Sequence, residues 1–113
     1  MLGLKNALLV DRTVYSFAGK FKSPNNDVYT TVYYFISKPE TLVVDYKNGI
    51  ETFTPELEIT IKGEHPILVN DYFTLDNGTK RKVYGVSLNY KEHNIAVRDL
   101  LKPVVDSMVL VLR

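Results

Sequence analysis

An acid, a base and an ion pair lie close together in the segment NYKEHNIAVRDLL at positions 89–101. Glu92 and His93 are adjacent, and Arg98 and Asp99 follow a few residues later. A histidine oriented by a carboxylate is a common general base, so this segment is the first candidate for catalysis. His93 and Asp99 are six residues apart, however, and do not share one face of a helix. The pattern therefore favours a solvated helix face with local ion pairs.

The other residues with catalytic or metal-binding side chains have no functional spacing. His65 precedes a proline in a turn, and the two histidines lack the spacing of metal ligands. Glu56 and Glu58 alternate with apolar residues, which places both carboxylates on the solvent side of a strand. The chain has no cysteine, its serines lack a nucleophile elbow, and no glycine-rich phosphate loop is present. The sequence predicts no catalytic residue, no metal site, no cofactor and no enzymatic activity.

Size and charge narrow the class of protein. The chain has 113 residues, which fits a single domain over 1–113 with a core of its own. Its 14 Lys and Arg against 13 Asp and Glu give a net charge of +1, which argues against a sequence-wide electrostatic grip on nucleic acid. The N-terminal segment LGLKNALLV is too short for a signal-peptide core, and no stretch approaches the ~18 apolar residues of a membrane span. We expect a soluble protein, made in the cytoplasm, with no membrane partner.

Most of the chain has the alternation and composition of β-strands. The segment ELEITIK at 56–62 alternates cleanly, with its aliphatic side chains inward and its polar ones outward. TVYSF at 13–17 and DVYTTVYYFIS at 27–37 are rich in β-branched and aromatic residues, which suit strands and are expected to pack in the core. KRKVYGVSL at 80–88 is expected to place three apolar side chains on one face: Tyr84, Val86 and Leu88.

Turn signals separate these strands. Asn48-Gly49 and Asn77-Gly78 are strong hairpin signals, because both residue types accept positive φ angles. We therefore predict a hairpin from DYFTL at 71–75 into KRKVYGV at 80–86. The predicted fold class is all-β, a small antiparallel barrel or sandwich with one short helix near the C-terminus.

The helix and the last strand are predicted from the C-terminal quarter. An apolar stripe at i, i+3, i+4 and i+7 predicts a helix over 94–102, which Asn94 caps and Pro103 ends. The following segment, VVDSMVLVLR at 104–113, is apolar on both faces, as expected of a strand that is buried on both sides. We interpret this strand as part of an interface with another subunit or partner, through Met108, Leu110 and Leu112.

A second candidate interface is the segment AGKFKSPNND at 18–27. Its glycine, proline, asparagines and aspartate predict a long loop between two strands, and loops of this length are usually functional or mobile. Phe21 between two lysines has the pattern of an anchor for a partner's pocket. We predict a loop that is poorly ordered in the isolated subunit and ordered in an assembly, with these partner-binding residues: Lys20, Phe21, Lys22, Asn25, Asn26 and Asp27.

The second half of the chain has a recognisable order of parts: ITIKG, then ILVNDYFTLDNGTKRKVYGVSLNY, then HNIAVRDLLKPVVDSMVLVL. Over about residues 57–112 this order resembles the small head-closure proteins (stopper or minor capsid proteins) of long-tailed bacteriophages. The family pattern is an apolar residue, an aspartate with an alternating run, a turn, and a basic residue with a second alternating run. It is matched here by Val69, Asp71, Tyr72, Phe73, Leu75, Gly78, Arg81, Val83, Tyr84 and Val86.

The resemblance implies a structural protein of the virion neck, made in the cytoplasm of a bacterial host. Such subunits form a homo-oligomeric ring, dodecameric in the family, below the portal and adaptor ring. The ring extends the DNA channel, with double-stranded DNA only as its contents, and offers a docking surface to the tail terminator or tail tube. The helix that contains Arg98 would then be a docking or packing surface.

Two alternatives stay open. A tail terminator protein is also strand-rich. The many tyrosines and phenylalanines, together with the basic run Lys80-Arg81-Lys82, are also compatible with a small OB-like barrel that binds single-stranded nucleic acid. The ordinary interpretation of this basic run is a solvated edge that discourages strand pairing.

Overall fold

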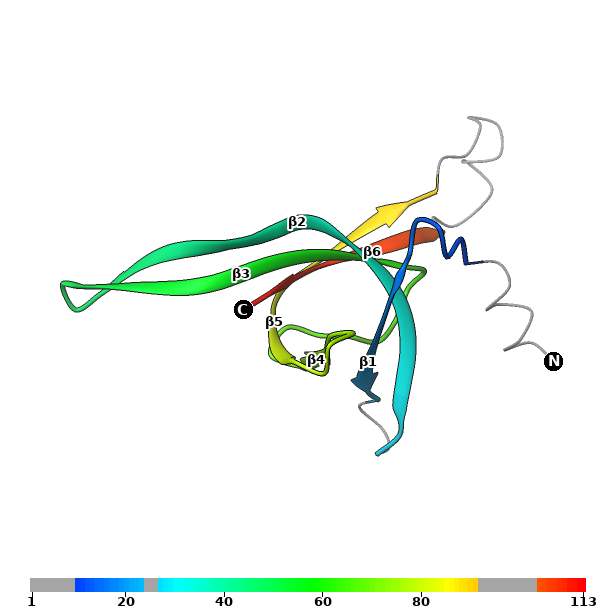
Figure 1. Cartoon of the computed structure of the whole chain (residues 1–113), viewed down its shortest axis with the longest axis horizontal. Helices are drawn as coiled ribbons and strands as arrows, with labels where there is room; N and C mark the ends of the chain where they lie inside the picture. Colours follow the sequence, from blue (N-terminus) through cyan, green and yellow to red (C-terminus); the bar gives the residue numbers. More distant parts are fainter. Residues whose placement is uncertain (1–9, 24–26, 92–103) are drawn as a thin grey trace.

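The computed structural model describes residues 10–23, 27–91 and 104–113, which form six β-strands (Figure 1). The strands pair antiparallel and close into a barrel in the order β1-β2-β3-β6-β5-β4, with β4 pairing back onto β1. The predicted all-β class is confirmed, and the architecture is the barrel. The short helix predicted over 94–102 lies outside the described residues. The strands are β1 (Phe17–Lys22), β2 (Tyr29–Lys47), β3 (Ile50–Lys62), β4 (Tyr72–Thr74), β5 (Lys80–Tyr90) and β6 (Val105–Leu112).

The core is the inside of this barrel. The alternation predicted for 56–62 is confirmed, since Leu57, Ile59 and Ile61 are buried while Glu56 and Glu58 lie on the outer side of β3. All strands of the barrel contribute side chains, because every second residue of a strand faces the same way. The buried apolar residues are Phe21, Val32, Tyr34, Leu57, Ile59, Ile61, Ile67, Phe73, Val83, Met108, Leu110 and Leu112.

The predicted hairpin between 71–75 and 80–86 is confirmed as β4 and β5. Gly78 has a φ of 87°, and the Leu75 N–H donates to the Thr79 carbonyl across the turn. The predicted inward face of β5 is wrong for Tyr84, which is 57% exposed, whereas Val86 and Leu88 do pack against the core. A bulge explains the difference. The pairing with β6 shifts between Val83 and Gly85, so Tyr84 is an extra residue and the alternation changes phase there.

The predicted loop over 18–27 is also wrong in its first half. Strand β1 continues to Lys22, and Phe21 lies in the barrel core with 2% of its surface exposed, opposite the buried Phe73 of β4. Phe21 alternates with two exposed lysines, which is the pattern of a barrel strand and equally that of an exposed anchor. Of the predicted strand over 13–17, only Phe17 lies in a strand, after a turn and a bend. The expected core packing of its aromatics is wrong, since Phe17 is exposed and Tyr15 is only half-buried.

The C-terminal strand belongs to the domain itself. Met108, Leu110 and Leu112 are between 0 and 2% exposed, and β6 is paired with β3 on one side and β5 on the other. The assignment of these three side chains to a subunit interface is therefore corrected. The inner face of β6 is apolar because it lines the barrel core. Its outer face carries Val109 and Val111, which are half-buried.

Candidate interaction surface

Strands β2 and β3 continue far beyond the barrel as a two-stranded projection (Figure 1). β1 pairs with β2 only over Tyr29–Tyr34, and β6 pairs with β3 only from Leu57 onward. Among the described residues, the strand pairs of 41–56 are therefore only with each other, and we call this segment the arm. Its tip is the Asn48-Gly49 turn, with φ angles of 54° and 76°, the two-residue turn whose twist matches antiparallel strands.

One face of the arm is apolar and exposed. Residues directly opposite in an antiparallel pair have side chains on the same side, so the register defines this face. Leu42, Tyr46 and Phe53 are 65%, 74% and 60% exposed, respectively. These side chains continue the core-facing side of β3, which passes from Ile59 and Leu57 out of the barrel. We call this surface the apolar face, and its residues are the pairs Leu42–Pro55 and Val44–Phe53 together with Tyr46, whose partner Glu51 adds one acidic side chain near the tip.

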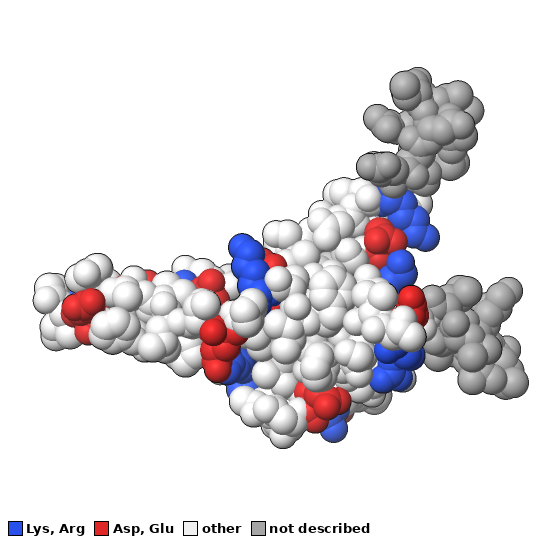
Figure 2. Space-filling view, turned by 45° about the horizontal axis from the view of Figure 1, so that its top comes forward, with Lys and Arg blue, Asp and Glu red and all other residues white. Residues whose placement is uncertain are grey.

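The apolar face lacks a covering layer within the described part of the chain. A two-stranded hairpin is at best marginally stable in water, because it cannot bury its apolar side. On the side that Figure 2 shows, the arm is a largely uncharged projection, with acidic and basic groups at its base and an acidic group near its tip. The strand edges are less suited to a partner than the face. Pro39 and Pro55 have no N–H to donate, so they interrupt both open edges near the base.

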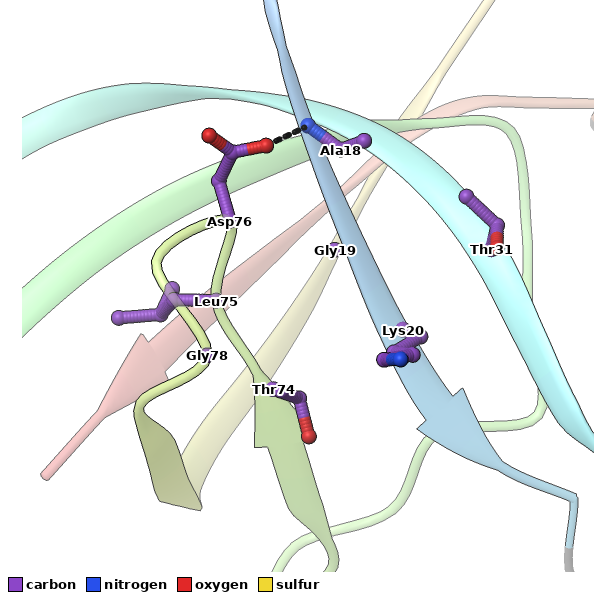
Figure 3. Close-up of a pocket in the computed structure, with 8 residues that line it drawn as sticks. All are labelled: Ala18, Gly19, Lys20, Thr31, Thr74, Leu75, Asp76 and Gly78. Carbon is purple, nitrogen blue, oxygen red and sulfur yellow. Dashed lines mark hydrogen bonds between the residues drawn. The ribbon is translucent and has the colours of Figure 1, made fainter.

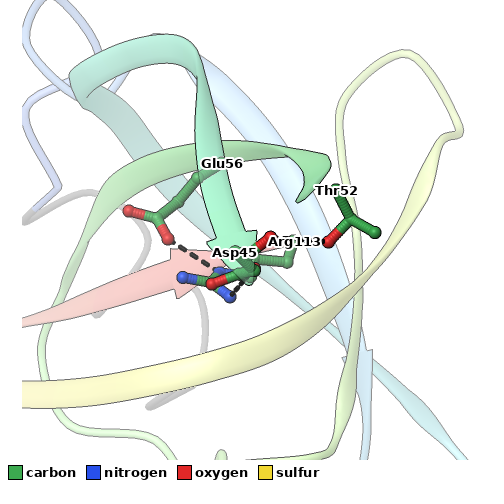
Figure 4. Close-up of polar contacts among 4 residues, drawn as sticks. All are labelled: Asp45, Thr52, Glu56 and Arg113. Carbon is green, nitrogen blue, oxygen red and sulfur yellow. Dashed lines mark hydrogen bonds and ion pairs between the residues drawn. The ribbon is translucent and has the colours of Figure 1, made fainter. Parts of the chain in front are cut away.

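The opposite face of the arm is fastened to the barrel by Arg113 (Figure 4). Its Nε donates to Glu56 Oε2 at 2.8 Å, and its Nη1 lies 3.4 Å from Asp45 Oδ2. The guanidinium also stacks 3.6 Å from the ring centre of Tyr84, the residue that the bulge of β5 turns outward. The hydrogen bond with Glu56 raises the pKa of Arg113 above its ordinary value. These contacts fix the root of the arm, so its apolar face has a defined direction.

The barrel mouth lies where the apolar face begins. A hollow of about 330 Å³ has an apolar floor that includes Tyr34, Ile36 and Leu57. Arg81 faces this mouth, since it is opposite the buried Phe73, and its Nη2 pairs with the Glu40 carboxylate from the root of the arm. The Nη1 of Arg81 is buried without a hydrogen-bond partner in the described residues. The mouth and the apolar face together form one continuous surface suited to protein contact.

The described residues that the sequence offered for catalysis or metal binding take part in other contacts. Glu56 pairs with Arg113, and Glu58 lies 3.9 Å from Lys38. His65 Nε2 lies 3.0 Å from the Lys62 carbonyl, and the ring packs edge-on against Phe21, which is a structural role. No group of three or more acidic or histidine side chains is placed to hold a metal ion in the described ranges.

The remaining predicted site residues fall into two groups. Lys20, Lys22 and Asp27 lie on the barrel surface, where Lys22 Nζ and Asp27 Oδ1 are 3.1 Å apart. The others lie outside the described residues: Asn25, Asn26, Arg98, and the opening candidates Glu92, His93 and Asp99. The arm itself was missed, although the sequence contains its signal. Alternating apolar residues flank Asn48-Gly49 on both sides for longer than a small barrel needs.

The comparisons with known proteins leave the family open. No protein-family model, no curated protein and no solved structure matches this chain. No helix long and apolar enough to span a membrane is found in the parts of the chain that the structure describes.

Proposed function

We propose that this chain is a structural subunit of a bacteriophage head-tail connector. In this proposal it forms a homo-oligomeric ring below the portal and adaptor proteins, extends the DNA channel and presents a docking surface to the tail. The observation that supports the proposal best is the apolar face of the arm. An exposed apolar surface of this kind on a small domain is typical of a protein–protein contact.

The arm suits a ring for a geometrical reason. It extends from one side of the barrel, so its apolar face meets a different part of the neighbouring subunit. Such a head-to-tail contact is heterologous, and it closes into a ring when the rotation between subunits allows. The fastened root gives each contact the same direction, which a closed ring requires.

The head-closure pattern supports the same proposal from the sequence. In the structure, Phe73 and Val83 of that pattern are fully buried, and Arg81 pairs with Glu40 at the barrel mouth. The pattern thus maps on the β4–β5 hairpin and on the junction with the arm. The Arg81–Glu40 ion pair and the buried Phe73 and Val83 have structural roles, in keeping with a structural subunit.

The experiment compares two arm variants with the same replacement. Phe53 on the apolar face and Ile50 on the opposite face are similarly exposed, at 60% and 64%. Phe53→Thr and Ile50→Thr both keep a good strand-forming residue. We expect native mass spectrometry and electron microscopy to show closed rings for the wild type and for Ile50→Thr, and monomers for Phe53→Thr.

Circular dichroism and thermal unfolding of both variants control for folding. Loss of rings in both variants would mean that apolar surface in general, and not this face, drives association. A wild-type chain that stays monomeric at high concentration, alone and with portal and tail proteins of the same phage, would contradict the proposed function.

A further inference from the structure

A second surface, on the barrel wall away from the arm, concentrates positive charge. Phe73 of β4 is buried, so its cross-strand neighbours Phe21 and Arg81 also face inward, and the residues next to them face out. The register then places four lysines of β1 and β5 on both sides of the short strand β4. We call this surface the lysine face, and its residues are Lys20, Lys22, Lys80 and Lys82 with Tyr29, Thr31, Tyr72 and Thr74.

The lysines are regularly spaced around an exposed tyrosine. Alternate residues of one strand are about 7 Å apart, and strands two positions apart are separated by about 10 Å. Tyr72 of β4 is opposite Lys82, and by continuation of the β1–β4 register it is also beside Lys22. Its ring is 56% exposed, so it lies open between charged side chains.

The charge on this face is largely unpaired. Lys22 forms an ion pair with Asp27, and this hydrogen bond raises the pKa of Lys22. No acidic side chain in the described residues forms an ion pair with Lys20, Lys80 or Lys82. The whole chain has a net charge of +1. Positive and negative charges are thus nearly equal in number over the chain but unevenly distributed on its surface, and one wall of the barrel is basic.

Protection of a strand edge does not explain these lysines. Lysines at an open edge discourage unwanted strand pairing, but a closed barrel has no open edge. Lys80 and Lys82 lie in the segment of β5 that pairs with β4, and Lys20 lies where β1 pairs with β4. The lysines therefore lie on paired strands of the barrel wall, where they are not needed to protect an open strand edge.

A hollow of about 290 Å³ lies within this surface, where β1 and the β4–β5 turn diverge (Figure 3). Lys20, Thr31 and Thr74 are among the residues that line it. Asp76 lies elsewhere along the hollow, and its Oδ1 accepts a hydrogen bond from the Ala18 N–H at 3.2 Å. An ammonium group with two hydroxyl donors is a suitable set for a phosphate oxygen.

We propose that the lysine face binds the sugar–phosphate backbone of nucleic acid, with Tyr72 available to stack on an unpaired base. Lysines provide backbone affinity without sequence selection, and an exposed aromatic ring among them is the arrangement that binds single strands. The ligand is either a duplex or a single strand, and the two share the phosphate chemistry. The inference is independent of ring formation, because the lysine face lies on the barrel wall and the apolar face lies on the arm.

The test is fluorescence anisotropy of a labelled duplex and a labelled oligothymidine strand over a series of salt concentrations. The variant Lys20→Gln/Lys80→Gln/Lys82→Gln is compared with Lys38→Gln/Lys47→Gln/Lys91→Gln, which removes the same net charge from other surfaces. Each phosphate contact contributes about −0.9 to the slope of log affinity against log salt for a duplex and about −0.7 for a single strand. We expect the first variant to reduce the size of the slope by about 2 to 3 and the second to leave it unchanged.

Tyr72→Ala separates the two ligands. If bases stack on this ring, the variant weakens binding of the single strand by about tenfold and leaves duplex binding unchanged. Equal loss in both triple variants, or no wild-type binding at low salt, would overturn the proposal. Binding of polyglutamate as tight as that of the oligonucleotides would assign the face to an acidic protein instead. Sedimentation velocity on the same samples shows independently whether each variant forms rings.

Discussion

At the scale of single residues, Tyr34 links the barrel wall to the β4–β5 turn. Its hydroxyl accepts a hydrogen bond from the Asp76 N–H at 3.0 Å, and its ring packs between Phe17 and the edge of Phe73. Burial raises the pKa of the Tyr34 hydroxyl above its ordinary value of 10.0. The neutral hydroxyl is therefore part of the folded state.

The sign of this shift gives a testable pH dependence. A group whose pKa is raised by folding contributes stability that is complete below its unfolded pKa and decreases as the pH rises above it. Tyr34→Phe is expected to cost about 1 kcal/mol at pH 7, because the Asp76 N–H loses its acceptor. Urea unfolding should show the difference between wild type and variant shrinking as the pH rises above 10.0. A difference that grows with pH would contradict the assignment.

Residue patterns also mark what the sequence could predict. The run 56–62 alternates without interruption, so its inward and outward faces follow directly from the period of a strand. The outward direction of Tyr84 could not be predicted in this way, because one extra residue in the bulge reverses the alternation of inward and outward side chains. Gly85 is the only local signal of that bulge in the sequence. Phe21 has lysine neighbours in either interpretation, and only the pairing of β1 with β4 decides that it is in the core.

At the scale of elements, β1 and β4 pack closely together at Gly19. A Cβ placed on Gly19 would lie 2.5 Å from the ring carbons of Phe73, whose side chain is fully buried. The ring therefore occupies the space of a missing side chain. Gly85 of β5 is different, since a Cβ there would meet Val111 at an ordinary contact distance of 3.7 Å.

This contrast predicts opposite tolerance at the two glycines. Gly19→Ala should destabilise the barrel by about 2 kcal/mol, because the buried ring must shift. Gly85→Ala should change the free energy of unfolding by less than about 1 kcal/mol, since it fits and restricts the unfolded chain. Chemical denaturation measures both. Equal effects would mean that the Gly19 contact relaxes freely.

For the arm, the sequence indicates a hairpin but does not indicate that the hairpin extends beyond the barrel. Asn48-Gly49 identifies a hairpin, and its flanks alternate as strands do. The length of the pairing beyond the barrel follows only from where β1 and β6 end, which is a property of the tertiary fold. For the same reason, Met108, Leu110 and Leu112 read equally well as interface or core until the two neighbours of β6 are known.

At the scale of the whole molecule, the two surfaces lie on different parts of the fold, the arm and the barrel wall. The apolar face belongs to β2 and β3 beyond the barrel, and the lysine face belongs mainly to β1, β4 and β5. In a ring, the first would join neighbouring subunits and leave the second free for nucleic acid. The central claim is that the apolar face is covered when the protein assembles.

Thiol labelling tests this claim most directly, because the chain has no cysteine of its own. Leu42 on the apolar face and Ile50 on the opposite face are 65% and 64% exposed in the single subunit, so Leu42→Cys and Ile50→Cys start from matched accessibility. The reaction rate of each thiol with a maleimide is measured in dilute, monomeric protein and in the assembled state. We predict that assembly slows labelling at position 42 at least several-fold and leaves position 50 nearly unchanged. Equal rates at position 42 in both states would contradict the account.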